Sequence, residues 1–550
     1  MPGNDGVSNA HHFDARDDLK PPEVSGKAII FFYTSSLANV LSPLARTLRD
    51  DHGFRVVLIS TYKRLLPSPR FYDFNLDDFD EVHFCGDTLI PRSGDALPSS
   101  RELADQGWSL EQRYGVSALD FVRVDRMVGI DFVVGADFHR SKYGNLCSHD
   151  QALDVSLRLA NEMEALLKRL RPVAVVGFPG SIFTNALISI GEAMGIPMRY
   201  LWAPRRGNLY SWICNRWGWH HNFRSSYEEE LAAALNEESL IGGHSTSTEH
   251  KVSERSLGAR NALRQQTSVV HLARTAYRHV RRDLPDIVRR RQPLYDSYLI
   301  REKLRLELQT WRWRRRALKE KPVFQSLPSD LPFIFFPLHV EPEISVMVEC
   351  AKADNQLTLI DWLAKALPAG WRLLIKEHPA QASDRLPGFW EQVRRYPNVE
   401  VLATLERAEE VITKAKAVAV LNSTVGLQAA NLALPVLTFH KHYLPGLMPH
   451  VTYCSSFEET RQALRDVAGE ALPSPSHRHA AARAFDRALR RSEFPVTNKE
   501  MLAGKSARTP MAKHEFELMV ELLLDSLPDT GNDDTCDLLR PDQSGQEGKG

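Results

Sequence analysis

Apolar and polar residues alternate in blocks along this chain, and the same block pattern occurs twice. Short β-prone apolar runs are followed by stretches whose apolar residues recur at helical spacing, with glycine or proline between them. Apolar strands between amphipathic helices indicate parallel sheets covered by helices on both faces. The predicted strands cover 28–33, 55–60, 81–84, 173–178 and 198–202, and then 333–338, 372–376, 399–402, 417–421 and 435–439.

The predicted fold class is α/β, with two Rossmann-like doubly wound domains that face a cleft and a helical insertion between them. A length of 550 residues fits this organisation, because a single hydrophobic core rarely grows so large. The predicted parts are a disordered N-terminus (1–25), an N-terminal Rossmann-like domain (26–225), a basic helical insertion (226–328), a C-terminal Rossmann-like domain (329–470), C-terminal helices (471–527) and a disordered tail (528–550).

Composition narrows the function classes. The 69 Lys and Arg residues balance 69 Asp and Glu residues, so no general attraction to nucleic acid is expected. The six cysteines are far apart and form no C-x-x-C pair, which argues against a zinc ribbon and a disulfide scaffold. No secretion signal and no run of about 20 apolar residues is visible. We expect a cytoplasmic protein, with a peripheral position at the inner membrane as an option.

Three polar segments follow predicted strands of the second domain. Asn422, Ser423 and Thr424 open a helix, where free backbone N–H groups and the helix dipole attract phosphate, although a plain helix cap would have the same sequence. The segment 375–380, IKEHPA, places His378 after a strand with Lys376 and Glu377 beside it. A histidine there can donate to phosphate or act as an acid or base, or the segment is a surface turn.

The third segment, 336–345, carries His339 and Glu341, whose carboxylate suits ribose or sugar hydroxyls unless the loop is merely solvated. No second ligand cluster accompanies it, so we predict no metal site. Carboxyl ends of parallel strands meet at one edge of a sheet. The three segments together therefore predict that the second domain binds a phosphate-bearing ligand, with a nucleotide as the natural candidate and no further cofactor.

The segments FPLHVEPEIS, RLLIKEHP and AVAVLNSTVGLQAANLALPVLTF, in this order, resemble the capsule polysaccharide biosynthesis family over about 332–440. That family is related to bacterial β-Kdo transferases and has the two-Rossmann glycosyltransferase B fold. The resemblance implies that His378, Ser423 and Thr424 contact the phosphate of a nucleotide-sugar donor, such as a CMP-sugar. It also implies that Glu341 and Glu377 approach the donor nucleoside or ribose, in a donor site that further includes Lys376, Asn422 and His339.

The first domain is expected to hold the acceptor and supply a catalytic carboxylate. Asp125 and Asp131 in FVRVDRMVGIDF are the candidates, together with His378 in the second domain. Glu192 is a weaker candidate, because a solvated helix position is the preferred explanation for it.

The basic segment 278–316 contains thirteen Lys or Arg residues against five Asp or Glu, and Trp311 and Trp313 interleave with its arginines. This pattern suits an anionic membrane surface, single-stranded nucleic acid or a solvated helix face.

The predicted function is a glycosyltransferase that moves a sugar from a nucleotide donor to a surface polysaccharide or a lipid-linked acceptor. The alternatives on the same fold are a polyol-phosphate transferase, a nucleotide-sugar epimerase, and a non-catalytic component of capsule assembly or export.

Overall fold

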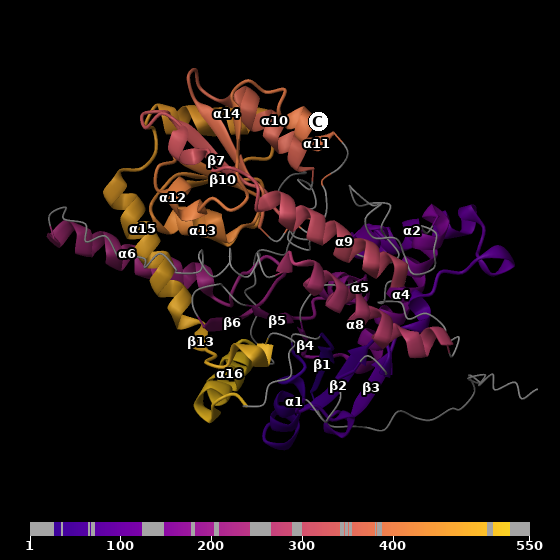
Figure 1. The fold of residues 1–550 in the computed structure, drawn as a ribbon. Coiled ribbons are helices and arrows are strands. Elements are labelled where there is room, and N and C mark those ends of the chain that lie inside the picture. The colour runs from indigo at the N-terminus through magenta and orange to yellow at the C-terminus, as the bar shows by residue number, and fades with distance from the viewer. Residues whose placement is uncertain are drawn as a thin grey trace, which may run out of the picture.

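The computed structural model describes most of the chain, and the statements below concern the described residues. These are 27–34, 37–63, 66–67, 72–123, 148–177, 182–202, 208–241, 266–288, 300–341, 346, 350, 355–379, 381, 385, 388–502 and 510–527. They form two α/β units, each built on one sheet (Figure 1).

The N-terminal unit is built on a seven-stranded sheet, here called sheet A, in the order β13-β6-β5-β4-β1-β2-β3. Strands β1 to β5 are parallel, whereas β6 and β13 are antiparallel to their neighbours. Its strands are β1 (Ala28–Phe32), β2 (Arg55–Ser60), β3 (Glu81–Phe84), β4 (Ala174–Gly177), β5 (Met198–Trp202), β6 (Leu209–Ile213) and β13 (Glu493–Pro495). Its helices are α1 (Leu41–Asp50), α2 (Ser100–Tyr114), α3 (Asp120–Arg123), α4 (His149–Leu170) and α5 (Ile182–Ala193).

The C-terminal unit is built on a six-stranded sheet, sheet B, in the order β12-β11-β10-β7-β8-β9. All its pairings are parallel, and its strand order is that of a doubly wound dinucleotide-binding sheet. Its strands are β7 (Phe333–Pro337), β8 (Arg372–Lys376), β9 (Val399–Leu402), β10 (Ala417–Val420), β11 (Val436–Thr438) and β12 (Val451–Tyr453). Its helices are α10 (Gln356–Ala366), α11 (Phe389–Val393), α12 (Ala408–Ile412), α13 (Thr424–Asn431) and α14 (Phe457–Ala468).

The C-terminal segment returns to the N-terminal unit. Helix α15 (Pro475–Arg491) leads away from sheet B, strand β13 pairs with β6, and α16 (Lys513–Asp525) packs beside that edge. Arg199 on β5 fixes this arrangement, because its buried guanidinium donates to the backbone oxygen of Ser526 from Nε at 2.8 Å. The two units are therefore connected both by the central part of the chain and by its end.

Within the described residues, three α-helices lie between β6 and β7 in the sequence. Helix α6 (Phe223–Ile241) is rich in glutamate and runs beside α15, where the guanidinium of Arg487 donates to both carboxylate oxygens of Glu237 at 2.9 Å. The basic character of the predicted insertion belongs instead to α8 (Val269–Val288) and α9 (Ile300–Ala317), which pack side by side (Figure 1).

The prediction of two Rossmann-like α/β units is confirmed, since both sheets have the expected parallel core. None of the described helices is long and apolar enough to cross a membrane. Cys85, Cys350 and Cys454 are free and buried, whereas Cys214 is disulfide-bonded. The wide spacing of the six cysteines, which argued against a disulfide scaffold, gave no sign of this disulfide.

Candidate functional site

Three loops leave the carboxyl edge of sheet B next to one another. Strand β7 lies between β8 and β10, and Pro337 is level with Lys376. Extending the β7–β10 register by two residues brings Val420 into the same row. Neighbouring strands lie about 5 Å apart, so all three predicted segments begin within about 10 Å. This edge includes the position between β7 and β10 where the strand order reverses, which is where doubly wound sheets bind ligands.

A buried arginine joins two of these loops. The guanidinium of Arg385 pairs with the carboxylate of Glu377 at 2.7 Å and with that of Glu341 at 2.8 Å. Arg385 also donates to the backbone oxygen of His339 at 2.5 Å. The side-chain oxygen of Gln356 accepts the His339 backbone N–H at 2.8 Å, and its amide nitrogen donates to Glu341. The loops after β7 and β8 are thus held together by a charged network.

The two predicted ribose ligands belong to this network. Glu377 is 6% exposed, and burial raises the pKa of the Glu341 carboxyl above its usual value, although Arg385 and Gln356 favour the ionised form. Two carboxylates and one guanidinium together carry one net negative charge. Because this charge is buried, it requires such a dense set of hydrogen bonds. In this structure Glu341 and Glu377 thus hold the loops in position through Arg385.

The side chain of Lys376 lies on the face of sheet B opposite to that of its neighbour Glu377. Side chains alternate along a strand, so Lys376 shares a face with Leu374, whose core cluster also contains Val420 and Ala429 of α13. Its ammonium donates to the backbone oxygen of Glu377 at 3.5 Å. The residue as a whole is 5% exposed. Burial lowers the pKa of Lys376 to about 8. A cation therefore lies on the sheet face that α13 covers.

The turn at 422–424 is a well-formed helix start. Ser423 is the N-cap of α13, and its hydroxyl accepts the Gly426 backbone N–H at 3.3 Å. Its backbone oxygen accepts the Tyr443 hydroxyl at 2.8 Å. A Cβ at Gly426 would lie 2.6 Å from that hydroxyl oxygen and 2.7 Å from a methyl of Val420, so only glycine lets α13 approach the sheet this closely. Asn422 and Thr424 flank Ser423 and are partly exposed.

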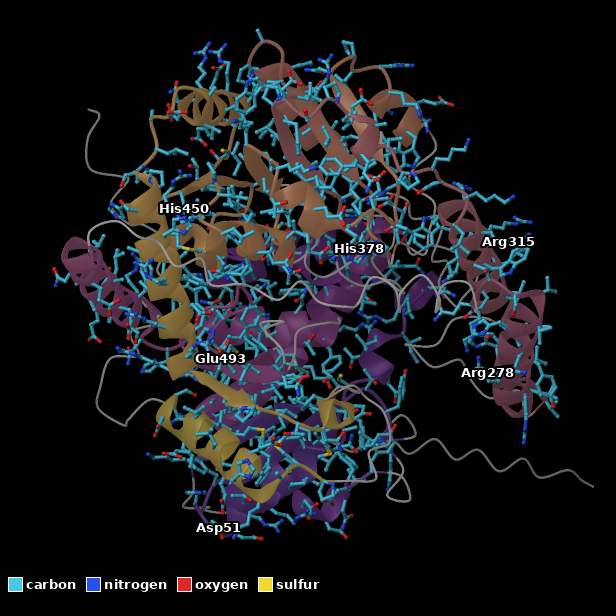
Figure 2. All side chains as sticks on the ribbon, turned by 60° about the vertical axis from the view of Figure 1, so that its left-hand side comes forward. Asp51, Arg278, Arg315, His378, His450 and Glu493 are labelled. Atoms are coloured by element: carbon cyan, nitrogen blue, oxygen red, sulfur yellow. The ribbon has the colours of Figure 1, made fainter. Side chains whose placement is uncertain are left out.

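His378 is the second residue after β8 and is partly exposed. Its backbone N–H donates to the Glu377 carboxylate at 2.9 Å, and its backbone oxygen accepts from Gln381 at 3.0 Å. Figure 2 shows His378 at the border of the C-terminal unit that is turned toward the N-terminal unit. The backbone at this position is fixed by the same network that holds Glu377.

Of the predicted carboxylates of the N-terminal unit, the structure describes only Glu192. Asp125 and Asp131 lie outside the described residues. Glu192 is not a solvated helix residue, because it pairs with the half-buried guanidinium of Arg216 at 2.7 Å. Arg216 also donates to the Ser189 hydroxyl at 3.3 Å. A general-base role for Glu192 would require breaking this ion pair.

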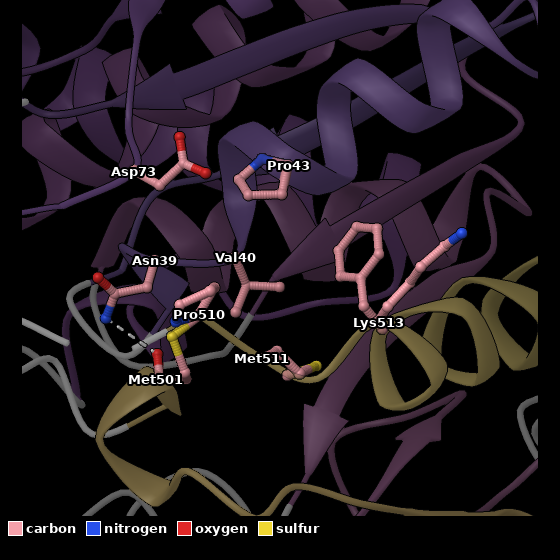
Figure 3. A pocket seen from close by; sticks show the side chains of 9 residues that line it. Asn39, Val40, Pro43, Asp73, Met501, Pro510, Met511 and Lys513 are labelled. Carbon is pink, nitrogen blue, oxygen red and sulfur yellow. Dashed lines mark hydrogen bonds between the residues drawn. The ribbon is translucent and has the colours of Figure 1, made fainter. Parts of the chain in front are cut away.

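A cavity of about 300 Å³ lies elsewhere, between α1 and the returning C-terminal segment (Figure 3). Its walls are mostly apolar, with Val40, Met501, Met511 and Phe516 among them. None of the predicted site residues lines it. Within the described ranges, no group of three or more histidine, cysteine, aspartate or glutamate side chains is arranged to hold a metal ion.

The topology defines a doubly wound α/β unit with three adjacent loops at one edge of its sheet, and a sequence comparison shows which family this part of the chain resembles. Residues 251–465 match the model of a family described as capsule polysaccharide biosynthesis protein. This range includes all of sheet B and all three predicted segments, so the resemblance to this family is confirmed for this part of the chain. No curated protein matches the chain.

Solved structures with a similar course of the chain have low sequence identity. The UDP-GlcNAc 2-epimerase from Neisseria meningitidis, bound to UDP-GlcNAc, is 13% identical over 91% of this chain and 100% of its own, with a TM-score of 0.25. The Thermosulfurimonas dismutans KpsC β-Kdo 2,7 transferase is 14% identical over 66% of this chain and 90% of its own, with a TM-score of 0.29. At these scores the comparison carries no conclusion about function.

Sequence patterns missed the residues that organise the site. Arg385 lies 8 residues after Glu377 in the chain, outside any strand or helix that a hydrophobic pattern predicts. Gln356 occupies the first position of α10 and is fully buried, although glutamine at a helix start usually faces water. The one available signal was the need of Glu341 and Glu377 for a cationic partner once both were placed at a sheet edge.

Proposed function

We propose that the protein is a glycosyltransferase that binds a nucleotide-sugar donor at the carboxyl edge of sheet B. The observation that carries this proposal is the coincidence of two findings. The part of the chain that matches the capsule polysaccharide biosynthesis family contains a complete doubly wound sheet. The strands beside its reversal point end in segments with the group types that hold phosphate.

The donor phosphate would lie over the N-terminus of α13. There the backbone N–H groups after Ser423 and the helix dipole favour an anion, and Lys376 supplies a cation on the same face of the sheet. His378 would donate a hydrogen bond from the neighbouring loop. These groups would stabilise the negative charge that develops on the leaving nucleotide when the glycosidic bond to the phosphate breaks.

The acceptor would be bound by the N-terminal unit. A carboxylate there, for which Asp125 and Asp131 are the proposed residues, would take the proton of the attacking hydroxyl. Glu341 and Glu377 would act indirectly, by keeping the loops of His339 and His378 in place through Arg385. A Kdo-like sugar delivered from a CMP-sugar to a polysaccharide or lipid-linked acceptor is the finer form of this proposal, because the three motifs resemble a family related to β-Kdo transferases.

Calorimetric titration of the full chain with CMP, UDP and CDP would test donor binding. One nucleotide should bind clearly more tightly than the others, and His378→Ala should weaken that binding at least about tenfold, the effect of one charge-assisted hydrogen bond. His514→Ala is the matched control, because His514 lies on α16 at the far end of the chain.

Transfer of a radiolabelled sugar from the preferred nucleotide to an oligosaccharide or lipid acceptor would separate a transferase from a non-catalytic nucleotide binder. Interconversion of the free nucleotide-sugar without transfer would indicate the epimerase alternative. If His378→Ala leaves both nucleotide affinity and turnover unchanged while the variant remains folded, the site assignment is wrong.

A further inference from the structure

Helix α8 exposes an unusual number of large apolar side chains. Tyr277 is 63% exposed and Val288 is 71% exposed, and neither touches a core cluster. Most of the large hydrophobic residues that the described part of the molecule leaves exposed lie on this helix, namely Val269, Val270, Tyr277, Val280, Leu284 and Val288.

These side chains share one face of the helix. At about 100° per residue, all six positions fall within an arc of about 100°. They span the whole helix, which at about 1.5 Å per residue gives a strip nearly 30 Å long. A continuous apolar strip of this kind is the pattern of a helix that buries one side.

The opposite side of α8 is already occupied. Thr275 is buried, and His279 pairs with Glu307 of α9 at 3.2 Å. The indole N–H of Trp311 on α9 donates to the backbone oxygen of Thr267 at 2.9 Å. Packing against α9 therefore accounts for the inner face of α8, and it leaves the apolar strip without a partner among the described residues.

Cationic side chains border the strip. Arg274, Arg278 and Arg281 are exposed and lie along one of its edges. On α9, the guanidinium of Arg315 lies over the ring of Trp311 at 4.8 Å. Figure 2 shows Arg278 and Arg315 on the helix pair at the margin of the molecule.

We propose that α8 lies flat on an anionic lipid bilayer, with its apolar strip inserted at the headgroup boundary and its arginines on lipid phosphates. An apolar strip with a cationic border is the arrangement by which interfacial helices bind such surfaces, and no described helix spans a membrane. The cationic border matches the negative surface of the lipid, which favours a bilayer over a second copy of a chain without net charge. This surface goes beyond the proposed transfer reaction, and it extends the sequence prediction for 278–316 toward the start of α8.

Co-sedimentation of the full-length protein with vesicles tests this proposal. The protein should bind vesicles of phosphatidylglycerol and phosphatidylcholine in equal parts, and bind pure phosphatidylcholine vesicles much less. Val280→Asp combined with Leu284→Asp should lower binding at least about tenfold, since two apolar side chains lose their burial. Trp108→Asp is the matched control, because Trp108 is 64% exposed but lies on α2, outside this helix pair.

The cationic border needs a second variant. Arg274→Glu combined with Arg281→Glu should lower binding at least about tenfold at low salt, and the difference should shrink as salt is added. Arg394→Glu combined with Arg395→Glu, on the exposed surface after α11, should leave binding unchanged.

Two results would overturn the proposal. One is equal sedimentation of the wild type and the Val280–Leu284 variant, with circular dichroism showing both folded. The other is a concentration-dependent dimer in sedimentation equilibrium that the same variant dissolves, because the strip would then be an interface between two copies.

Discussion

Each unit of the molecule buries an arginine beside its sheet, and the two arginines have different partners. Among the described residues, Arg199 on β5 of the N-terminal unit donates to the backbone oxygen of Ser526, to its hydroxyl at 3.0 Å, and to the backbone oxygen of Met198 at 2.8 Å. Arg385, at the edge of the C-terminal sheet, pairs with the carboxylates of Glu377 and Glu341. Both are almost fully buried.

The difference distinguishes an arginine that stabilises the fold from an arginine that holds the loops of the candidate site. Neutral backbone acceptors satisfy a guanidinium wherever the chain passes, and Arg199 uses them to attach the end of the chain to sheet A. Two buried carboxylates are costly to keep together, and such a group is retained at a place where precise loop positions matter. The contrast supports the proposed donor site at the C-terminal edge of sheet B.

The largest expected effect is the loss of Arg385. Arg385→Ala leaves Glu341 and Glu377 buried without a cation, which should lower the free energy of unfolding by about 3–5 kcal/mol. Urea unfolding followed by circular dichroism measures it. Adding Glu341→Gln and Glu377→Gln should restore part of the loss, because no unpaired charge then remains. A loss below about 1 kcal/mol for Arg385→Ala would contradict the stabilising role of this network.

Replacing Lys376 should raise the free energy of unfolding, whereas replacing Arg385 should lower it. Its pKa in the folded state is about 8 against 10.5 in the unfolded chain, so below the lower value the folded state carries a buried charge at a cost. The unfolding free energy of the wild type should therefore rise with pH between these two values. Lys376→Met should abolish this rise and stabilise the protein by about 3 kcal/mol at neutral pH.

The same substitution should weaken nucleotide binding, because the ammonium would pair with donor phosphate. Calorimetry near the lower pKa in buffers of different ionisation enthalpy should show proton uptake on binding in the wild type and none in Lys376→Met. A variant that gains stability and keeps full affinity would place Lys376 outside the donor site.

Arg199 gives a smaller effect of a different kind. Arg199→Met should lower the unfolding free energy by about 2 kcal/mol, the range for hydrogen bonds from a charged donor. Limited proteolysis should cut the variant near α16 faster, while nucleotide affinity stays unchanged. Affinity that falls together with stability would erase the contrast between the two arginines.

The smallest effect belongs to a surface pair. Arg461 on α14 pairs with Glu458, and the two side chains are 42% and 66% exposed. Arg461→Ala should change the unfolding free energy by less than about 1 kcal/mol. A larger loss would show that the ranking of these arginines by burial is unsound.

The sheets followed from the sequence because their strands are continuous apolar runs between helices. The run 372–376 is the strand β8 residue for residue, and 399–402 is β9. Strand β12 was not predicted, because it has only three residues. Strands β6 and β13 were not predicted either, since Leu209–Ile213 follows β5 closely and the three residues of β13 come after all the predicted strands. Their pairing depends on the return of a distant segment, which local patterns do not encode.

The site was predictable only as far as strand ends reveal it. The pattern placed His339, His378 and Asn422 after adjacent strands, and the structure starts their loops in one row. The partners of Glu341 and Glu377 come from residues 356 and 385, whose positions depend on how loops fold across the edge. The exposed strip on α8 escaped notice because its apolar spacing equals that of a buried helix.

Hydrogen–deuterium exchange with and without the preferred nucleotide tests the central claim most directly, because it reports where the donor binds. The account predicts slower exchange in the segments 376–381 and 421–428, at the end of β8 and the start of α13, with little change in sheet A. Protection confined to the N-terminal unit, with both of these segments unaffected at saturating nucleotide, would contradict it.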